Sequence, residues 1–365
     1  MRYQLLGRSG LRVSELSLGT MTFGEDWGWG ANKETSQEIF EMYANAGGNF
    51  IDTANLYTNG TSEKYVGEFI KADREAFVVA TKYTLTPTPN QENGREDRPN
   101  MVGNHRKNMM QAVEHSLKRL DTEYIDLLYV HAWDYTTPVE EVMRAMDDLV
   151  RQGKVMYVAA SDTPSWILAE ANTRAELMGW SRFLGIQAPY SLLGRDLERA
   201  ILPAARHHDL AVLPWGILNG GVLTGKFLKD HDAPTRVNKN VMDNMSEDKV
   251  AVVREVVAIG EEVGKPPAQV AINWVRQQQH RAQIVPILGA RTIPQMKDNL
   301  ECLDWELTQE QLDQLDKVSD VSLGFPFNFT YANPFVYGNT FDKIDIPAKH
   351  RQVPTVRPEA KNNSD

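Results

Sequence analysis

Cysteine is almost absent from this chain of 365 residues, which contains only Cys302. One cysteine cannot form a disulfide within the chain, and it cannot supply the several thiolates of a cysteine-rich metal site. Sparing use of cysteine is typical of proteins from a reducing compartment. We therefore expect a cytoplasmic protein without a metal ion.

Long uncharged hydrophobic runs are missing as well. No segment approaches the ~18 residues that a membrane-spanning helix needs, and the N-terminal segment has no apolar stretch of signal-peptide length. Basic residues are fewer than acidic ones, 39 against 49, which gives a formal net charge of −10. Without a cluster of Lys and Arg, neither nucleic acid nor an anionic membrane is an expected partner. We expect a small molecule instead, and the sequence leaves the oligomeric state open.

Short hydrophobic runs alternate with stretches of helical periodicity along most of the chain. The runs are nearly continuous, as expected for parallel strands that are covered on both faces. They lie at 16–19, 49–52, 77–82, 125–131, 155–161, 183–187, 210–215 and 282–288. Amphipathic patterns predict helices at 34–46, 63–71, 105–120 and 139–150. Strands and helices that alternate in this way predict a (β/α)8 TIM barrel. A doubly wound sheet is the alternative, but no predicted strand is followed by GxGxxG.

Additional segments flank the predicted barrel. Residues 3–5 and 12–14 are expected to form an N-terminal β-hairpin. Residues 84–104 and 226–245 are expected to be long βα loops, which commonly carry function. We expect one barrel domain over residues 1–318. Residues 319–365 are then a C-terminal extension, rich in aromatic residues, that packs on the barrel and frays at its end.

Four ionisable residues follow consecutive predicted strands at the edge where a barrel places its reactive groups. They are Asp52, Tyr57, Lys82 and His131. Each alone has an ordinary explanation as a cap, a packing residue, a solvated charge or a structural hydrogen-bonding group. Together at one mouth they indicate proton transfer, since an ammonium beside a phenol, whose pKa is about 10, stabilises the phenolate and lowers that pKa. Such a centre can protonate the alkoxide formed when hydride attacks a carbonyl carbon, and the hydride source would be a nicotinamide.

Six segments, in this order, are similar to the aldo-keto reductases. They are FIDTANLY (50–57), TK (81–82), YVHAWD (129–134), QAPYSLL (187–193), GVLTGKF (221–227) and PILGARTIPQMKDNL (286–300). The resemblance covers about residues 1–320 and is closest to the aryl-alcohol-dehydrogenase-like branch. It implies that Tyr57 is the general acid in reduction and the general base in oxidation. Lys82, paired with Asp52, would lower the pKa of Tyr57, and His131 would position the substrate carbonyl.

The resemblance also implies a cofactor site for NADP(H) in preference to NAD(H). Ser161, Asp162 and Gln187 match positions that hold the nicotinamide carboxamide, although relatives usually have Asn at the position of Asp162. Trp215 matches the aromatic residue on which the nicotinamide stacks. The residues implied to hold the pyrophosphate are Gly216, Leu218, Gly225 and Lys226, and those implied to contact the adenine are Gln295 and Asn299.

The GAR segment within the last motif also suits an anion on its own chemistry. Gly289 permits a close approach of the backbone, and Arg291 precedes a predicted helix, whose N-terminus favours anions. A guanidinium here could bind a 2′-phosphate in a bidentate manner, which distinguishes NADP from NAD. Without the resemblance, Arg291 could equally be a solvated charge near a helix cap.

The substrate and the activity are less closely specified. Trp27, Trp133 and Phe325 are candidate substrate-binding residues, suited to an aryl aldehyde, a ketone or a sugar, and surface packing explains each equally well. The main hypothesis is an NADP(H)-dependent carbonyl reductase or alcohol dehydrogenase. A non-catalytic NADP(H)-sensing regulatory subunit of a channel or another protein is the alternative. A Schiff-base aldolase with Lys82 as the nucleophile is a third possibility, but it gives Tyr57 and the GAR segment no role.

Overall fold

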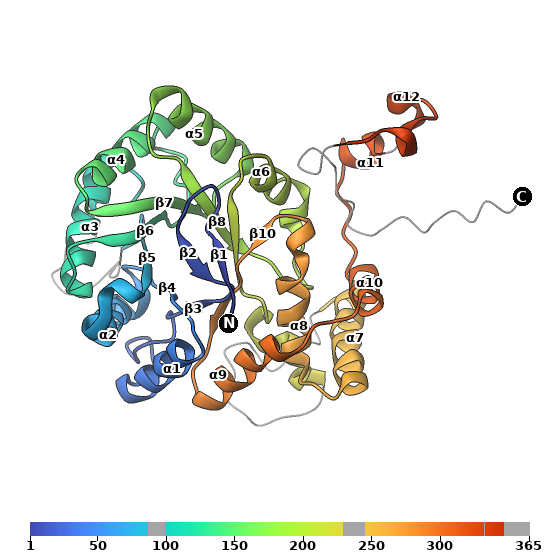
Figure 1. The fold of residues 1–365 in the computed structure, drawn as a ribbon, viewed down its shortest axis with the longest axis horizontal. Helices are drawn as coiled ribbons and strands as arrows, with labels where there is room; N and C mark the ends of the chain where they lie inside the picture. Colours follow the sequence, from blue (N-terminus) through green and yellow to red (C-terminus); the bar gives the residue numbers. More distant parts are fainter. Residues whose placement is uncertain (87–98, 229–244, 332, 347–365) are drawn as a thin grey trace, which may run out of the picture.

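The protein is a closed barrel of parallel strands surrounded by helices (Figure 1). The computed structural model describes residues 1–86, 99–228, 245–331 and 333–346. The strands are β1 (Tyr3–Leu5), β2 (Arg12–Ser14), β3 (Ser17–Gly19), β4 (Phe50–Asp52), β5 (Val78–Tyr83), β6 (Ile125–Val130), β7 (Val155–Ser161), β8 (Phe183–Pro189), β9 (Ala211–Trp215), β10 (Gln283–Ile284) and β11 (Ile287–Gly289). Every predicted strand is present, with ends that differ by a residue or two.

The barrel closes through an interrupted eighth strand. The order in the sheet is β10-β9-β8-β7-β6-β5-β4-β3-β11, and all of these neighbours are parallel. β10 pairs with β9 and β11 pairs with β3, and the two segments are consecutive in the chain on either side of Val285 and Pro286. Proline lacks the N–H that a continuous ladder requires, which accounts for the interruption. The predicted (β/α)8 barrel is therefore confirmed.

Helices surround the strands and pack their apolar faces on them. They are α1 (Lys33–Asn45), α2 (Thr61–Ile70), α3 (Arg106–Leu120), α4 (Val139–Arg151), α5 (Ser165–Met178), α6 (Ile201–His207), α7 (Glu247–Val263), α8 (Pro267–Arg276), α9 (Ile293–Leu300) and α10 (Gln309–Val318). In α4 the buried side chains recur at the predicted helical spacing. α8 is buried from Ala268 to Arg276, and α7 packs against it on the side away from the strands (Figure 1).

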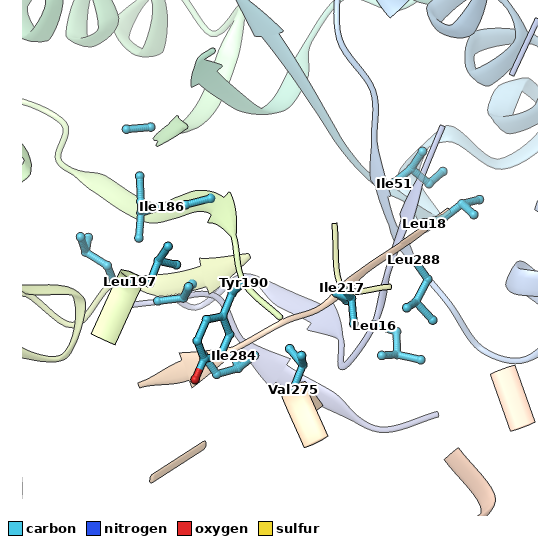
Figure 2. Close-up of a cluster of buried hydrophobic side chains, with 14 of the residues drawn as sticks. Leu16, Leu18, Ile51, Ile186, Tyr190, Leu197, Ile217, Val275, Ile284 and Leu288 are labelled. Atoms are coloured by element: carbon cyan, nitrogen blue, oxygen red, sulfur yellow. The ribbon is translucent and has the colours of Figure 1, made fainter. Parts of the chain in front are cut away.

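Two hydrophobic layers hold this arrangement together. The larger layer lies between the strands and the helices, where Leu18, Ile51, Ile186 and Leu288 are among the residues drawn in Figure 2. The smaller layer fills the barrel interior with alternate residues of the strands, such as Phe50 in β4. This alternation is what a strand dictates, because successive side chains point to opposite faces.

The N-terminal hairpin of β1 and β2 covers one end of the barrel, as Figure 1 shows in the centre of the view. Leu6 and Val13 are fully buried and belong to the interior layer. The Gly7 N–H also donates a hydrogen bond of 2.9 Å to the Gln283 side chain in β10. The predicted hairpin is confirmed, and it leaves the opposite, carboxyl-terminal mouth for the candidate site.

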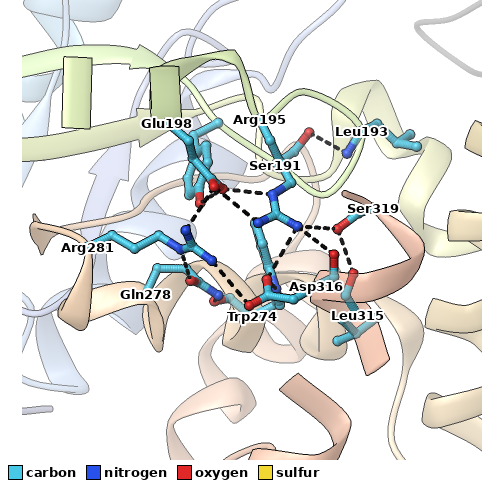
Figure 3. A network of polar contacts seen from close by, with 11 residues as sticks. Ser191, Leu193, Arg195, Glu198, Trp274, Gln278, Arg281, Leu315, Asp316 and Ser319 are labelled. Carbon is cyan, nitrogen blue, oxygen red and sulfur yellow. Dashed lines mark hydrogen bonds and ion pairs between the residues drawn. The ribbon is translucent and has the colours of Figure 1, made fainter. Parts of the chain in front are cut away.

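A buried polar network fixes α10 to the segment that follows β8 (Figure 3). Glu198 pairs with Arg195 at 2.7 Å and with Arg281 at 2.8 Å, and Asp316 in α10 pairs with the same two arginines at 3.4 and 3.2 Å. Arg195 also donates a hydrogen bond of 2.8 Å to the Ser319 hydroxyl, where the C-terminal extension begins. Because the two cations are matched by two carboxylates, the buried charges are compensated.

Beyond this anchor the extension carries two short helices, α11 (Phe327–Thr330) and α12 (Pro334–Tyr337), which lie outside the ring of barrel helices (Figure 1). The side chains of Phe325 and Phe335 are 86% and 96% exposed. The boundary at residue 318 and the packing of the extension on the barrel stay predictions. Its expected frayed end lies outside the described residues, as do most of the two expected long loops.

Candidate active site

The ammonium of Lys82 is the centre of the site at the carboxyl-terminal mouth. It is fully buried in β5 and donates hydrogen bonds to Asp52 Oδ2 at 2.7 Å, to the Thr53 carbonyl oxygen at 2.8 Å and to the Tyr57 hydroxyl at 3.1 Å. The three donors of the ammonium are thereby satisfied, and its charge is neutralised by a carboxylate that is 3% exposed.

Strand register explains why these side chains meet. In β5, Val78 and Ala80 point into the barrel, and Lys82 follows them at the same alternation. β4 pairs with β5 so that Asp52 lies opposite Ala80, one inward-facing position below Lys82. A side chain as long as lysine can therefore turn toward the carboxylate and the loop that follows β4.

Tyr57 stands on a tight turn directly after β4. The two residues that follow it, Thr58 and Asn59, have positive φ angles of 44° and 54°. A β-branched residue rarely adopts this conformation, so the surrounding structure must hold it. The Thr58 hydroxyl donates a hydrogen bond of 2.6 Å to the Phe23 carbonyl and accepts one of 3.1 Å from the Ser62 N–H. These contacts fix the direction in which Tyr57 leaves the backbone.

The protonation states of the pair follow from burial and charge. Burial raises the pKa of Tyr57, and the adjacent Lys82 ammonium opposes this without overcoming it. Lys82 therefore lowers the pKa of Tyr57, as expected, while burial makes the net direction upward. Burial lowers the pKa of Lys82, but Asp52 and Tyr57 raise it, and the net direction is upward. The pair thus consists of a neutral phenol and an ammonium, which is the state of a proton donor with a cation ready to stabilise its conjugate base.

His131 follows β6 and contacts Tyr57, with the two rings nearly perpendicular and their centroids 5.9 Å apart. Its backbone N–H donates a hydrogen bond of 3.2 Å to the Thr84 hydroxyl, while its Nδ1 is buried and has no hydrogen-bond partner among the residues that the structure describes. Burial and the charge of Lys82 lower the pKa of His131 to about 3. The imidazole is therefore neutral near pH 7, so that it can orient a carbonyl oxygen through an N–H without adding charge.

This lowered pKa predicts a pH dependence of stability. The pKa of a histidine in the unfolded chain is about 6.5, whereas the pKa of His131 in the folded protein is about 3. Between these values the unfolded chain binds more protons, so the contribution of His131 is complete above about pH 6.5 and is lost as the pH falls toward 3. We expect His131→Gln to lose less thermal stability than the wild type between pH 7 and 5. Tm measurements test this, with exposed His115→Gln as the control, and equal losses in the wild type and His131→Gln would contradict it.

The predicted nicotinamide residues lie on the neighbouring strand ends. Gln187 in β8 donates a hydrogen bond of 2.7 Å from its amide to Asp52 Oδ1, which joins it to the Lys82 pair. Ser161, at the end of β7, is 1% exposed, and Trp215, at the end of β9, is 40% exposed. The Trp215 side chain is one of the influences that lower the pKa of the Asp162 carboxyl. All four thus belong to the mouth that contains Tyr57.

The predicted pyrophosphate segment is a chain of tight turns after β9. Positive φ angles recur at Gly216 (68°), Gly221 (92°) and Gly225 (74°), and a side chain added at Gly221 would approach Lys226 Nζ to 3.1 Å. Leu218 lies in the same segment, at the N-cap of the short 3-10 helix Asn219–Thr224. Glycine-rich turns of this kind expose backbone N–H groups to a phosphate.

Two cations flank this segment. Burial and the charge of Arg291 lower the pKa of Lys226. In the described part of the chain, neither cation forms an ion pair with a carboxylate. Two cations that repel each other beside N–H donors form a donor set that suits phosphate groups.

The GAR segment leads into α9, as expected. Gly289 ends β11, and its carbonyl accepts a hydrogen bond of 3.2 Å from the Asn299 amide. The Gln295 side chain accepts a hydrogen bond of 2.9 Å from the Arg291 N–H. Asn299 is 4% exposed, so in this structure its amide holds the loop, as does that of Gln295. The adenine contacts of Gln295 and Asn299 stay predictions.

The three predicted substrate residues are placed differently from one another. The Trp27 indole donates a hydrogen bond of 3.4 Å to Asn59, two residues after Tyr57, and therefore borders the site. Trp133 is 8% exposed and packs in the layer between strands and helices. Phe325 is 86% exposed and contacts Phe329 in the extension. Of the three, only Trp27 is brought to Tyr57.

Two functional groups have no counterpart among the predictions. The Thr53 main-chain carbonyl accepts a hydrogen bond from Lys82. Every residue carries such a carbonyl, so the sequence does not indicate which one binds the ammonium. Thr58 holds the turn that carries Tyr57, and the neighbouring Asn59-Gly60 pair is a turn signal that could have indicated it. The described residues include no group of His, Cys, Asp and Glu arranged to hold a metal ion. They also include no helix that combines the length and the hydrophobicity required to cross a membrane.

The fold and the site together define a (β/α)8-barrel protein with a buried lysine and aspartate and a half-buried tyrosine at its carboxyl-terminal mouth. Residues 15–320 match the aldo/keto reductase family. The chain belongs to this family and is therefore an oxidoreductase of the aldo-keto reductase type, as the sequence motifs predict.

Individual members of the family are similar to this chain over most of its length. The chain is 38% identical over 347 residues to an aryl-alcohol dehydrogenase (NADP(+)) of Phanerodontia chrysosporium. The matched region covers 89% of this chain and 87% of the relative. It is 36% identical over 336 residues to a norsolorinic acid reductase of Aspergillus flavus, with 90% and 84% covered. A putative aryl-alcohol dehydrogenase of Saccharomyces cerevisiae is 35% identical over 345 residues, with 92% and 91% covered.

Proposed function

We propose that the protein is an NADP(H)-dependent oxidoreductase that reduces aldehydes or ketones to alcohols, or catalyses the reverse reaction. The observation that carries this proposal is the hydrogen bond of 3.1 Å from buried Lys82 Nζ to the Tyr57 hydroxyl. It makes the phenol a proton donor whose conjugate base is stabilised at once. The names of the relatives, an NADP(+) aryl-alcohol dehydrogenase and a norsolorinic acid reductase, support the same class of reaction.

In this proposal each side chain of the mouth has one task. Tyr57 donates its proton to the carbonyl oxygen of the substrate as hydride arrives at the carbon, and Lys82 stabilises the resulting phenolate. Asp52 holds the ammonium in position from the opposite side. His131 orients the carbonyl oxygen through a neutral N–H. In the oxidation of an alcohol, the phenolate form of Tyr57 accepts the hydroxyl proton.

The residues present fit a nicotinamide dinucleotide with a 2′-phosphate. The glycine-rich turns after β9 offer N–H donors, and Lys226 and Arg291 form a cationic pair without a carboxylate partner in the described chain. A bound nicotinamide would supply the hydride. Trp215, Ser161, Asp162 and Gln187 would hold its ring and carboxamide beside Tyr57, while Lys226 would hold the pyrophosphate.

Removal of the Arg291 guanidinium tests the preference for NADP(H). We expect Arg291→Ala to raise the KM for NADPH by about ten- to a hundredfold, because charge-assisted hydrogen bonds to the 2′-phosphate are lost. The KM for NADH should change little, since NADH lacks that phosphate. Lys297→Ala, which removes an exposed cation from α9, the helix that Arg291 precedes, is the matched control. An equal change for both cofactors would remove the assignment of Arg291.

Activity assays separate the proposed reaction from the two alternatives. The isolated chain, given NADPH and a panel of aromatic aldehydes, aliphatic aldehydes, ketones and sugars, should oxidise NADPH with at least one substrate class. Binding of NADPH without turnover on the whole panel would favour the regulatory subunit instead. Trapping of a Lys82 adduct with borohydride would favour the aldolase, but the raised pKa of Lys82 and its bond to Asp52 disfavour the neutral amine that this reaction needs.

A further inference from the structure

Asp162 places a second carboxylate at the barrel mouth. It follows β7 directly and adopts the left-handed conformation, with a φ of 42°. Its backbone is held from both sides, because its N–H donates a hydrogen bond of 3.0 Å to the Gln187 carbonyl and its carbonyl accepts one of 3.4 Å from the Trp133 N–H. The side chain is therefore held at the mouth between the ends of β6 and β8.

The charge of this carboxylate is not cancelled locally. Lys82, the nearest buried cation, already forms its ion pair with Asp52 at 2.7 Å. Among the described residues no basic side chain forms an ion pair with Asp162. The neutral side chain of Trp215 is one of the influences that lower the pKa of Asp162. Asp162 is exposed at the mouth. The desolvation that remains raises its pKa, whereas Trp215 and the charge of Lys82 lower it and favour the ionised form. Asp162 in turn acts on the site, because its charge is one of the influences that raise the pKa of Tyr57.

We propose that Asp162 sets the balance between the two oxidation states of the bound nicotinamide, and that its carboxylate makes the reduced cofactor a stronger hydride donor. This inference rests on the proposed function, since it requires the nicotinamide to lie beside Trp215. The oxidised ring carries a positive charge and the dihydronicotinamide ring carries none. A carboxylate beside the ring would therefore favour the oxidised form, and it would also favour the positive charge that develops on the ring as hydride leaves.

The direction of the bias follows from the balance of the reaction. In reduction, a C–H bond of the dihydronicotinamide breaks and its electron pair forms the new C–H bond of the substrate, while Tyr57 gives its proton to the carbonyl oxygen. The substrate is reduced by two electrons and the cofactor is oxidised by two. Because Asp162 stabilises the oxidised product relative to the reduced reactant, it promotes hydride transfer to the carbonyl and opposes the reverse step on the enzyme.

The test is the ratio of two dissociation constants, Kd for NADP+ divided by Kd for NADPH, obtained from the quenching of tryptophan fluorescence. We expect Asp162→Asn to raise this ratio by about tenfold, as the loss of one partly screened charge predicts. Asparagine has the same shape and adopts left-handed φ angles readily, so the variant should fold like the wild type. Glu170→Gln removes one negative charge from α5, the helix that follows Asp162, and should leave the ratio unchanged.

The possible results distinguish this inference from the proposed function. If Asp162→Asn weakens the binding of both cofactors equally, or changes neither, then Asp162 acts through a hydrogen bond or not at all, and the inference is wrong. If the wild type binds neither NADP+ nor NADPH, the proposed function itself fails. The rate constant of hydride transfer from NADPH, measured in a single turnover, is a second test. This rate constant should be lower in Asp162→Asn, by a smaller factor than the one by which the ratio of the two dissociation constants changes.

Discussion

Tyr57→Phe is expected to lower the turnover number for carbonyl reduction by about 10²–10⁴-fold, which is the range for loss of a general acid. The substitution removes one oxygen atom, the acceptor of the 3.1 Å hydrogen bond from Lys82 Nζ, and leaves the ring in place. The Kd for NADPH should stay nearly unchanged, because the hydroxyl group has no proposed contact with the cofactor. Steady-state kinetics together with cofactor titration would show this separation.

The control for Tyr57→Phe is Tyr65→Phe, which removes a phenol hydroxyl from α2 outside the barrel mouth. We expect this variant to retain the turnover of the wild type. Full activity of Tyr57→Phe would remove Tyr57 from the reaction. A parallel loss of turnover and of NADPH binding would indicate that the substitution disturbs the site instead of the chemistry.

Lys82→Met should have the second large effect, on both stability and turnover. The ammonium is fully buried and pairs with Asp52 at 2.7 Å, so its removal leaves a buried carboxylate that keeps only the hydrogen bond from Gln187. We expect the free energy of unfolding to fall by about 3–5 kcal/mol, as is typical when one partner of a buried ion pair is removed. Turnover should fall as well, since no cation remains to stabilise the phenolate of Tyr57. Denaturant unfolding and steady-state kinetics measure the two effects.

A double variant separates these two roles of Lys82. Lys82→Met combined with Asp52→Asn removes the unpaired carboxylate, so most of the lost stability should return, while turnover should stay low. A double variant that regains turnover along with stability would show that Lys82 serves the structure alone. A Lys82→Met variant as stable as the wild type would contradict the burial argument.

Much of the site could be predicted because, in a barrel, a residue's position at the end of a predicted strand also gives its position in space. Lys82 and Asp52 end predicted strands, and the carboxyl ends of parallel strands in a closed barrel meet at one mouth. The hydrogen bonds that join Asp52, Lys82 and Tyr57 follow this expectation closely. Residues on loops were harder to place, because a loop has no alternation that determines which way a side chain points. Trp133, two residues after His131, is such a residue, and only the structure shows that it packs in the layer between strands and helices.

The electrostatic balance could not be read from the chain. The sequence shows that an ammonium can lie near Tyr57, but the net pKa direction depends on how strongly the phenol is buried, which only packing decides. The same holds for Asp162, which matters because Trp215 and Lys82 both lower its pKa and because no described basic residue forms an ion pair with it.

The sequence by itself determined the order of strands and helices, the hairpin and the residue types at the mouth, since these depend on local periodicity and on chemistry that each side chain carries alone. Only the tertiary structure decided the contacts between strands β4, β5 and β8, the carbonyl of Thr53 that holds Lys82, and the exposure of the Phe325 side chain. The physical reason is that burial, hydrogen bonding and charge compensation are properties of neighbours in space, and neighbours such as Asp52 and Gln187 lie far apart along the chain.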